Sequence, residues 1–141
     1  MPRLVYLDYA ATTPVWPEVW KTMEQVAIHQ FGNPSSLHLY GEEAEAVVHQ
    51  AKEKLLTLLG AKQGKIILTS GGTEANNLAL KGIARAYAQQ GKHIIVSAIE
   101  HDATLATCHA LEQEGFQVSY LPVDSYGRVD LDALDSAINE Q

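Results

Sequence analysis

Apolar residues recur at three- and four-residue spacings in two N-terminal segments, which predicts two amphipathic helices. The first covers residues 17–31, with Pro17 at a favourable first helical position and Gly32 as its stop. The second covers residues 42–59, with three glutamates in its first turn and Gly60 at its end. The expected buried stripes are Val19, Met23, Val26 and Ala27 in the first helix, and Ala44, Val47, Val48, Ala51, Leu55, Leu58 and Leu59 in the second.

Beyond residue 60, short apolar runs alternate with helical patterns. The sequence predicts strands at 66–69, 93–97 and 116–121, and helices at 73–90, at 102–114 and from Asp130 through Leu131, Leu134 and Ile138. Strands that alternate with helices pair in parallel through right-handed crossovers. Parallel strands are buried on both faces, as the apolar runs Ile-Ile-Leu and Ile-Ile-Val indicate. We therefore expect an α/β fold, a three-layer α/β/α arrangement with a largely parallel sheet.

Composition narrows the class of protein. The chain has 141 residues, about the length of one domain, and 46% hydrophobic residues, enough for a core. Its net charge of -7 argues against nucleic acid or anionic lipid as a partner. Cys108 is the only cysteine, so an intrachain disulfide and a Cys-rich zinc site are excluded, and we expect no metal centre. Without a signal-peptide or membrane-span pattern, we expect a cytoplasmic protein.

The segment 69–77 links a predicted strand to a predicted helix, and this is where open α/β sheets bind ligands. Gly71 and Gly72 let an anion approach the backbone, amide groups at a helix start attract phosphate, and the Thr73 hydroxyl can donate a further hydrogen bond. The segment matches neither of the glycine-rich nucleotide motifs. From these residues alone, a phosphate cradle and a tight turn capped by Thr73 are equally good interpretations.

His101 follows the next predicted strand, so we expect it at the same sheet edge as Gly72. An imidazole there can stack on an aromatic cofactor or move a proton. Taken by itself, the residue type favours a capping or surface histidine instead. Cys108 falls within the following predicted helix, where a core position is favoured over a nucleophile.

Four ordered motifs together resemble one enzyme family over nearly the whole chain. They are Tyr6-Leu7-Asp8-Tyr9-Ala10-Ala11-Thr12-Thr13-Pro14, Gly32-Asn33-Pro34-Ser35-Ser36-Leu37-His38, Thr69-Ser70-Gly71-Gly72-Thr73-Glu74-Ala75-Asn76-Asn77, and Glu100-His101. The combination is similar to the cysteine desulfurases of the NifS/IscS type. These are class V, fold-type I enzymes that use pyridoxal 5'-phosphate (PLP).

The resemblance implies roles for particular residues. Gly72 and Thr73 would hold the cofactor phosphate, and His101 would stack over the pyridine ring and assist proton transfer. The substrate end of the site, near a homodimer interface, would be built by the segments that contain Ala11, Thr12, Asn33, Ser35, Ser36 and His38. Family members convert L-cysteine to L-alanine and pass the sulfur to an enzyme cysteine as a persulfide. Scaffold or acceptor proteins then use it for iron–sulfur clusters or thionucleosides.

The resemblance also implies that parts of the machinery are missing from these residues. The family's Ser-x-His-Lys motif, whose lysine binds PLP as a Schiff base, does not occur in the sequence, and Cys108 does not match the sulfur-accepting cysteine. We therefore expect a truncated unit without desulfurase turnover of its own. Residues 1–60 would carry an active-site loop and two helices, and residues 61–141 part of the PLP-binding large domain.

Other interpretations stay open. The chain could belong to another class V enzyme, such as a selenocysteine lyase. It could instead be a non-catalytic α/β module that binds a phosphate-bearing ligand or a partner subunit. A third possibility is a degenerate fragment that barely folds, because exposed edges of a short parallel sheet favour aggregation.

Overall fold

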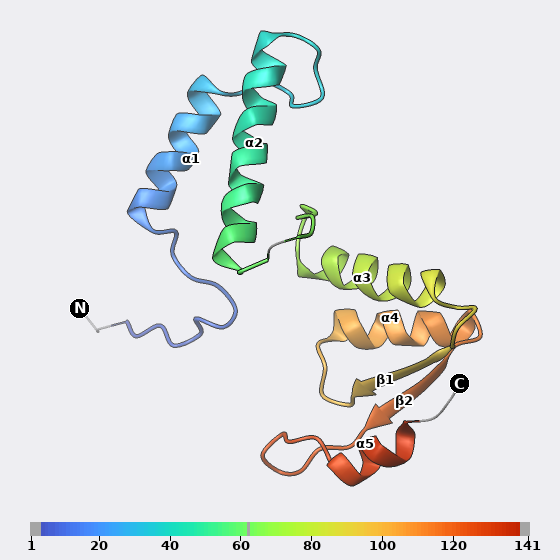
Figure 1. Cartoon of the computed structure of the whole chain (residues 1–141). Coiled ribbons are helices and arrows are strands. Elements are labelled where there is room, and N and C mark those ends of the chain that lie inside the picture. The colour runs from blue at the N-terminus through green and yellow to red at the C-terminus, as the bar shows by residue number, and fades with distance from the viewer. Residues whose placement is uncertain (1–3, 62, 139–141) are drawn as a thin grey trace. The chain divides into compact units, whose positions relative to one another are not determined.

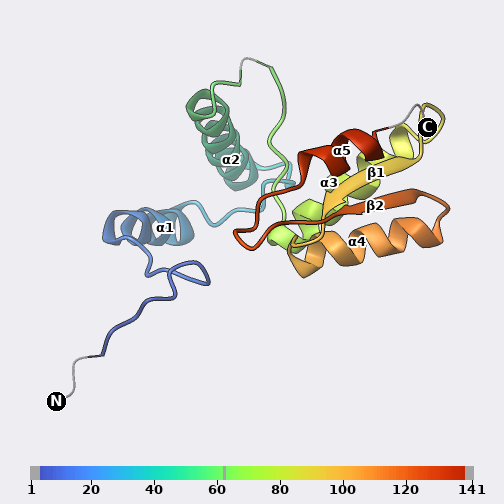
Figure 2. The ribbon, with the colours of Figure 1, turned by 90° about the horizontal axis from the view of Figure 1, so that it is seen from below.

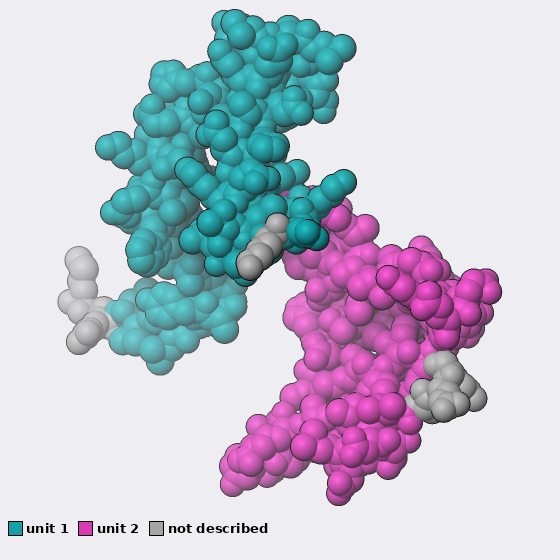
Figure 3. Space-filling model, viewed as in Figure 1, with its two compact units in different colours: residues 1–66 teal, residues 67–141 magenta. Residues whose placement is uncertain are grey.

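The computed structural model describes residues 4–61 and 63–138. The chain forms two compact units with the boundary between Ile66 and Ile67, and Figure 3 colours them separately. The division after residue 60 that we expect from the sequence concerns functional domains and stays a prediction.

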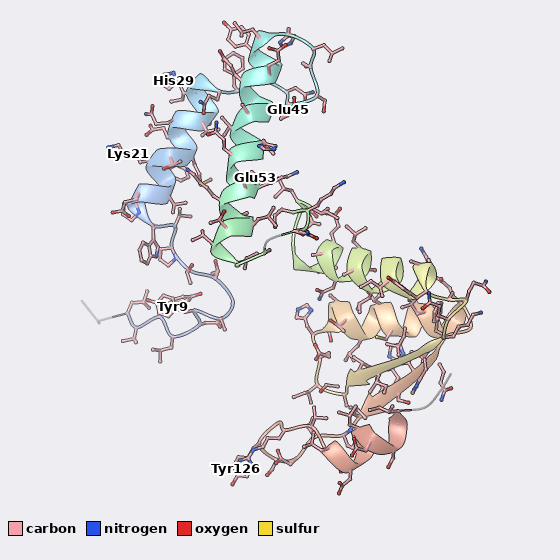
Figure 4. The ribbon with its side chains drawn as sticks, viewed as in Figure 1. Tyr9, Lys21, His29, Glu45, Glu53 and Tyr126 are labelled. Atoms are coloured by element: carbon pink, nitrogen blue, oxygen red, sulfur yellow. The ribbon has the colours of Figure 1, made fainter. Side chains whose placement is uncertain are left out.

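The first unit consists of an extended N-terminal segment and two helices, α1 (Pro17–His29) and α2 (Leu39–Leu58). Proline at the start of α1 fits the rule that its missing N–H costs nothing there. Helix α2 begins three residues earlier than the glutamate pattern predicts, because the His38 side chain caps it. The Nδ1 atom of His38 accepts a hydrogen bond from the Gly41 N–H at 3.3 Å. In Figure 4, Lys21 and His29 project from α1 on the side away from α2.

The apolar stripes of these two helices are less covered than the sequence predicts. No residue of α1 is buried, and Gly41 and Ala44 are the buried residues of α2. Leu58 is 82% exposed and Leu55 is 43% exposed. The predicted stripe of α2 is therefore covered only near the start of the helix, where Ala44 is buried and Val47 and Val48 are half-buried. The amphipathic pattern itself is real and leaves apolar surface free.

The second unit contains the predicted alternation of helices and strands. Its elements are α3 (Gly72–Ala86), β1 (His93–Ser97), α4 (Asp102–Gln113), β2 (Gln117–Leu121) and α5 (Leu131–Ala137). Strands β1 and β2 pair in parallel, with His93 beside Gln117 and Ser97 beside Leu121. Helices α3 and α4 lie to one side of this sheet and α5 to the other (Figures 1 and 2). The expected α/β/α layering with a parallel sheet is confirmed.

The predicted strand at residues 66–69 is wrong. These residues have no regular secondary structure, and Ile67 and Leu68 are exposed. A β-strand requires a neighbour that takes up its backbone hydrogen bonds. Within the described residues no strand pairs with this run, so the sheet has two strands where we expect three. The apolar run indicates a tendency to be buried and cannot by itself supply the partner.

The core of the second unit lies between α4 and β2. Cys108 and Leu111 on α4 have no exposed surface, and Phe116 and Leu121 are also buried. Thr107 is the buried polar residue here, and its hydroxyl donates to the Ala103 carbonyl oxygen at 2.8 Å. Because α4 has more buried residues than the other described helices, the position of its first turn is well defined by packing. None of the helices in residues 4–61 and 63–138 combines the length and apolar character that a bilayer crossing demands.

Candidate functional site

The start of α3 offers backbone N–H groups that nothing in the described chain uses. Gly71 is the N-cap residue, and no side chain caps the helix. The first amide with an acceptor is that of Ala75, which donates to the Gly71 carbonyl oxygen at 3.1 Å. No hydrogen bond from the N–H groups of Gly72, Thr73 or Glu74 occurs in the described residues. Unpaired amides at a helix start carry partial positive charge and suit an anion.

The two glycines keep this helix start accessible. A Cβ atom added to Gly71 or Gly72 would meet nothing within 4 Å, so the backbone faces open space there. The side chain of Thr73 is exposed beside it. The amides of Gly72 and Thr73 are therefore accessible to a phosphate group. The predicted cap by the Thr73 side chain is wrong, because no side-chain capping bond forms at this helix start.

Two side-chain bridges hold α3 and α4 side by side. The Asn76 amide donates to the Thr104 hydroxyl at 3.2 Å, near the starts of the two helices. Near their ends, Arg85 donates two hydrogen bonds to the Glu114 carboxylate, at 2.7 and 3.0 Å. The two bridges are nine residues apart along α3, from Asn76 to Arg85, and ten residues apart along α4, which correspond to about 14 and 15 Å of helix rise. The helices therefore run parallel with their starts at one end, as Figure 1 shows.

His101 lies at that same end, as the N-cap residue of α4. Its Nδ1 atom accepts a hydrogen bond from the Ala103 N–H at 3.1 Å, and its carbonyl oxygen accepts from Thr104 and Leu105. The capping role that its residue type favours is confirmed. The bond fixes the ring at the helix start and leaves Nε2 as the nitrogen that can carry the proton of a neutral imidazole. The structure thus brings Gly72, Thr73 and His101 to the same end of one helix pair.

Cys108, the seventh residue of α4, is fully buried. Burial raises the pKa of its thiol, and the nearby carboxylates of Glu112 and Glu100 raise it further. A thiol that is buried and protonated is neither accessible nor nucleophilic. The sequence-based interpretation of Cys108 as a core residue is therefore confirmed.

In the first unit, Ala11 and Thr12 form a closed turn. Their N–H groups both approach the Asp8 carbonyl oxygen, at 3.2 and 3.4 Å. The Tyr6 hydroxyl lies 2.8 Å from that oxygen and 3.1 Å from the Thr12 carbonyl oxygen, and it donates across the turn. Sequence reasoning did not single out Tyr6. Its position in the first of the four motifs was the only available signal.

Residues 33–38 form a second shaped segment of the first unit. The Asn33 side chain accepts from the Ser35 N–H and its carbonyl oxygen from the Ser36 N–H, both at 2.9 Å. A Cβ atom on Gly41 would collide with the Ser36 carbonyl oxygen, so the loop packs directly on the first turn of α2. His38 completes this arrangement as the cap of α2. These residues belong to the first unit, so their expected meeting with Gly72 and His101 stays a prediction.

Comparison with known proteins adds the decisive observation. The sequence model of the family described as Aminotransferase class-V matches residues 5–141. The chain belongs to the class-V aminotransferase family. Among class-V relatives, it is 51% identical over 140 residues to a cysteine desulfurase IscS of Dictyoglomus turgidum and 47% identical over 137 residues to a cysteine desulfurase of Homo sapiens. The resemblance to cysteine desulfurases that the four motifs indicate is confirmed.

Two solved structures of similar proteins share this fold. A NifS-like protein superposes with a TM-score of 0.89 at 39% identity, over 96% of this chain and 37% of its own. SspA in complex with cysteine superposes with a TM-score of 0.84 at 40% identity, over 95% and 39% of the two chains. The match to the Dictyoglomus protein covers 99% of this chain and 36% of that protein, and the match to the human protein covers 96% and 30%. It therefore spans about a third of the length of the relatives that it matches.

Proposed function

We propose that this chain is the part of a PLP-dependent cysteine desulfurase that binds the phosphate and faces the ring of the cofactor. The observation that carries the proposal is the pairing of two helix starts: open amides at Gly72 and Thr73 on α3, and the fixed imidazole of His101 on α4. The Asn76–Thr104 hydrogen bond joins α3 and α4 near these two helix starts. Membership in the class-V family supports PLP as the phosphate-bearing group.

Each residue has a distinct task in this proposal. The N–H groups of Gly72 and Thr73 bind phosphate oxygens, and the Thr73 hydroxyl donates one further hydrogen bond. His101 would be the residue that faces the pyridine ring and would offer the Nε2 proton, because its Nδ1 accepts from the Ala103 N–H. PLP, when bound, supplies the electron sink for bond breaking at the substrate amino acid. Such a site binds and orients without needing a nucleophile from these residues.

The substrate side of the proposal rests on the relatives. L-cysteine is the proposed substrate, because the similar proteins are cysteine desulfurases and one solved relative is described as being in complex with cysteine. The shaped segments at Ala11–Thr12 and 33–38 are proposed to complete the substrate end of the site in a homodimer. Transfer of the sulfur to scaffold or acceptor proteins of iron–sulfur assembly, in the cytoplasm, completes the proposal.

A titration of the 15N-labelled chain with PLP tests the cofactor part. We expect the backbone amides of Gly72 and Thr73 and the ring signals of His101 to shift together. Inorganic phosphate should shift the amides and leave the ring unchanged. A chain whose amides respond equally to both ligands while His101 never responds would be a phosphate-binding module, and the cofactor assignment would fail. Shifts confined to other residues would exclude both.

Turnover requires a second experiment, because the sequence has no Ser-x-His-Lys motif. We expect no sulfide from L-cysteine with the 141 residues alone. When the chain replaces the matching region of a cysteine desulfurase that supplies the lysine, sulfide release should return and should depend on Thr73. A hybrid that binds PLP and acts on selenocysteine but not on cysteine would replace the desulfurase assignment by a selenocysteine lyase.

A further inference from the structure

Glu74, the third residue of α3, bends its carboxylate back over the turn that precedes the helix. Its Oε2 atom accepts two hydrogen bonds from Ser70, one from the backbone N–H and one from the hydroxyl, each at 2.7 Å. These bonds tie residue 70 to the first turn of α3, across Gly71 and Gly72. The Thr69 hydroxyl adds a bond of 3.2 Å to the Gly71 carbonyl oxygen. The segment 69–72 is thus held from both sides, although it contains two glycines.

The same carboxylate has a natural alternative. An acidic side chain in the first turn of a helix commonly binds or neutralises the unpaired amides of that turn. Here both short bonds go to Ser70 instead, and the amides of Gly72 and Thr73 stay free. The Ser70 backbone N–H, and then its hydroxyl, lower the pKa of Glu74, so the group is a carboxylate at neutral pH. At neutral pH a negative charge therefore lies in the first turn of the helix that is proposed to bind an anion.

We propose that Glu74 is a positioning residue, which shapes the phosphate-binding turn through its two bonds to Ser70 while its charge weakens phosphate binding. The inference rests on the proposed function of Gly72 and Thr73. It assigns two opposite contributions to one side chain. The hydrogen bonds pre-order a glycine-rich turn and so reduce the ordering cost of binding. The charge repels the bound anion, and salt screens this repulsion.

Two substitutions separate the contributions. Glu74→Gln keeps an oxygen that accepts from Ser70 and removes the charge. Glu74→Ala removes both the charge and the acceptor. Relative to the unmodified chain, Glu74→Gln should bind inorganic phosphate about two- to five-fold more tightly at low ionic strength. Glu74→Ala should bind about five-fold more weakly than Glu74→Gln, the effect of losing a local capping-type bond.

The experiment measures phosphate affinity from the amide shifts of Gly72 and Thr73 in the 15N-labelled 141-residue chain, at low and at high salt. The advantage of Glu74→Gln over the unmodified chain should shrink at high salt, whereas the ratio between the Gln and Ala variants should persist. Asp132→Asn is the matched control, because it removes one carboxylate from the first turn of α5 on the other side of the sheet. It should leave the phosphate affinity unchanged at low and at high salt.

The outcomes are distinct. Equal affinities of Glu74→Ala and Glu74→Gln would overturn the positioning role and leave the phosphate site standing. A Glu74→Gln variant that is no tighter than the unmodified chain at low salt would overturn the electrostatic part. An unmodified chain whose Gly72 and Thr73 amides ignore phosphate would overturn the proposed function and this inference with it.

Discussion

His101 combines a helix cap with an aromatic ring, and the two parts can be removed separately. His101→Ala deletes both. His101→Asn deletes the ring but keeps a side-chain acceptor at the N-cap position, where asparagine is among the preferred residues. We therefore expect His101→Asn to retain the stability of the second unit and to lose the proposed cofactor contact. His101→Ala should lose both.

The magnitude follows from the single capping bond, the 3.1 Å contact between Nδ1 and the Ala103 N–H. Loss of a side-chain N-cap costs about 1 kcal/mol. For a unit the size of residues 67–141, that cost lowers the melting temperature by about 4–8 °C. The backbone bonds from Thr104 and Leu105 to the residue-101 carbonyl oxygen do not depend on the side chain, so the helix itself should persist.

Thermal unfolding followed by circular dichroism measures the first effect, and PLP binding followed by the absorbance of the cofactor measures the second. Equal destabilisation by Asn and Ala would refute the capping argument. If His101→Asn bound PLP as tightly as the unmodified chain, the ring would have no part in the site. A loss of PLP binding by His101→Asn without a loss of stability is the expected result.

Three further predictions concern packing and protonation. Leu111→Ala, at a fully buried position, should destabilise the second unit by about 2–5 kcal/mol in urea unfolding, whereas the exposed Leu131→Ala should change it by less than about 0.5 kcal/mol. Gly41→Ala should destabilise the first unit, because the added Cβ collides with the preceding loop. Gly82→Ala, inside α3 and facing open space, should stabilise the second unit by about 0.5–1 kcal/mol. A melting temperature that moves in the opposite direction in either variant would contradict the corresponding prediction. The raised pKa of Cys108 means that the folded state holds the thiol proton more tightly than the unfolded state, so stability should be retained below about pH 9.0 and fall as the pH rises through the folded pKa. A Cys108→Ala variant should lack this alkaline component, and rapid alkylation of the native thiol at neutral pH would show that Cys108 is not buried.

The regular elements of the second unit could be predicted because each has a local signal. The run 93–97 forms β1 with the predicted bounds, and the helix at 102–114 is α4 to within one residue. The helix at 73–90 ends four residues early, since residues 87–90 form turns before Gly91. Local patterns thus fixed element type well and helix ends less well.

The failures have one physical cause: a local sequence pattern does not show which other groups of the chain a segment will contact. The run 66–69 has the composition of a buried strand, yet strand formation depends on a neighbour's backbone groups. The early start of α2 was missed because the glutamate pattern begins only at residue 42, whereas the cap is His38, which accepts from a backbone N–H through Nδ1 as His101 does in α4. The Glu74–Ser70 bonds were missed because spacing does not say which way a carboxylate turns.

The two bridges between α3 and α4 make helix length matter as much as residue identity. A single residue inserted between Asn76 and Arg85 would rotate everything beyond it by about 100° about the helix axis. One bridge would then point away from its partner, and the register between the two helix starts would be free to slip. Evolution can therefore exchange side chains along this stretch far more easily than it can add or delete one, and alignments of functional relatives should run through it without gaps.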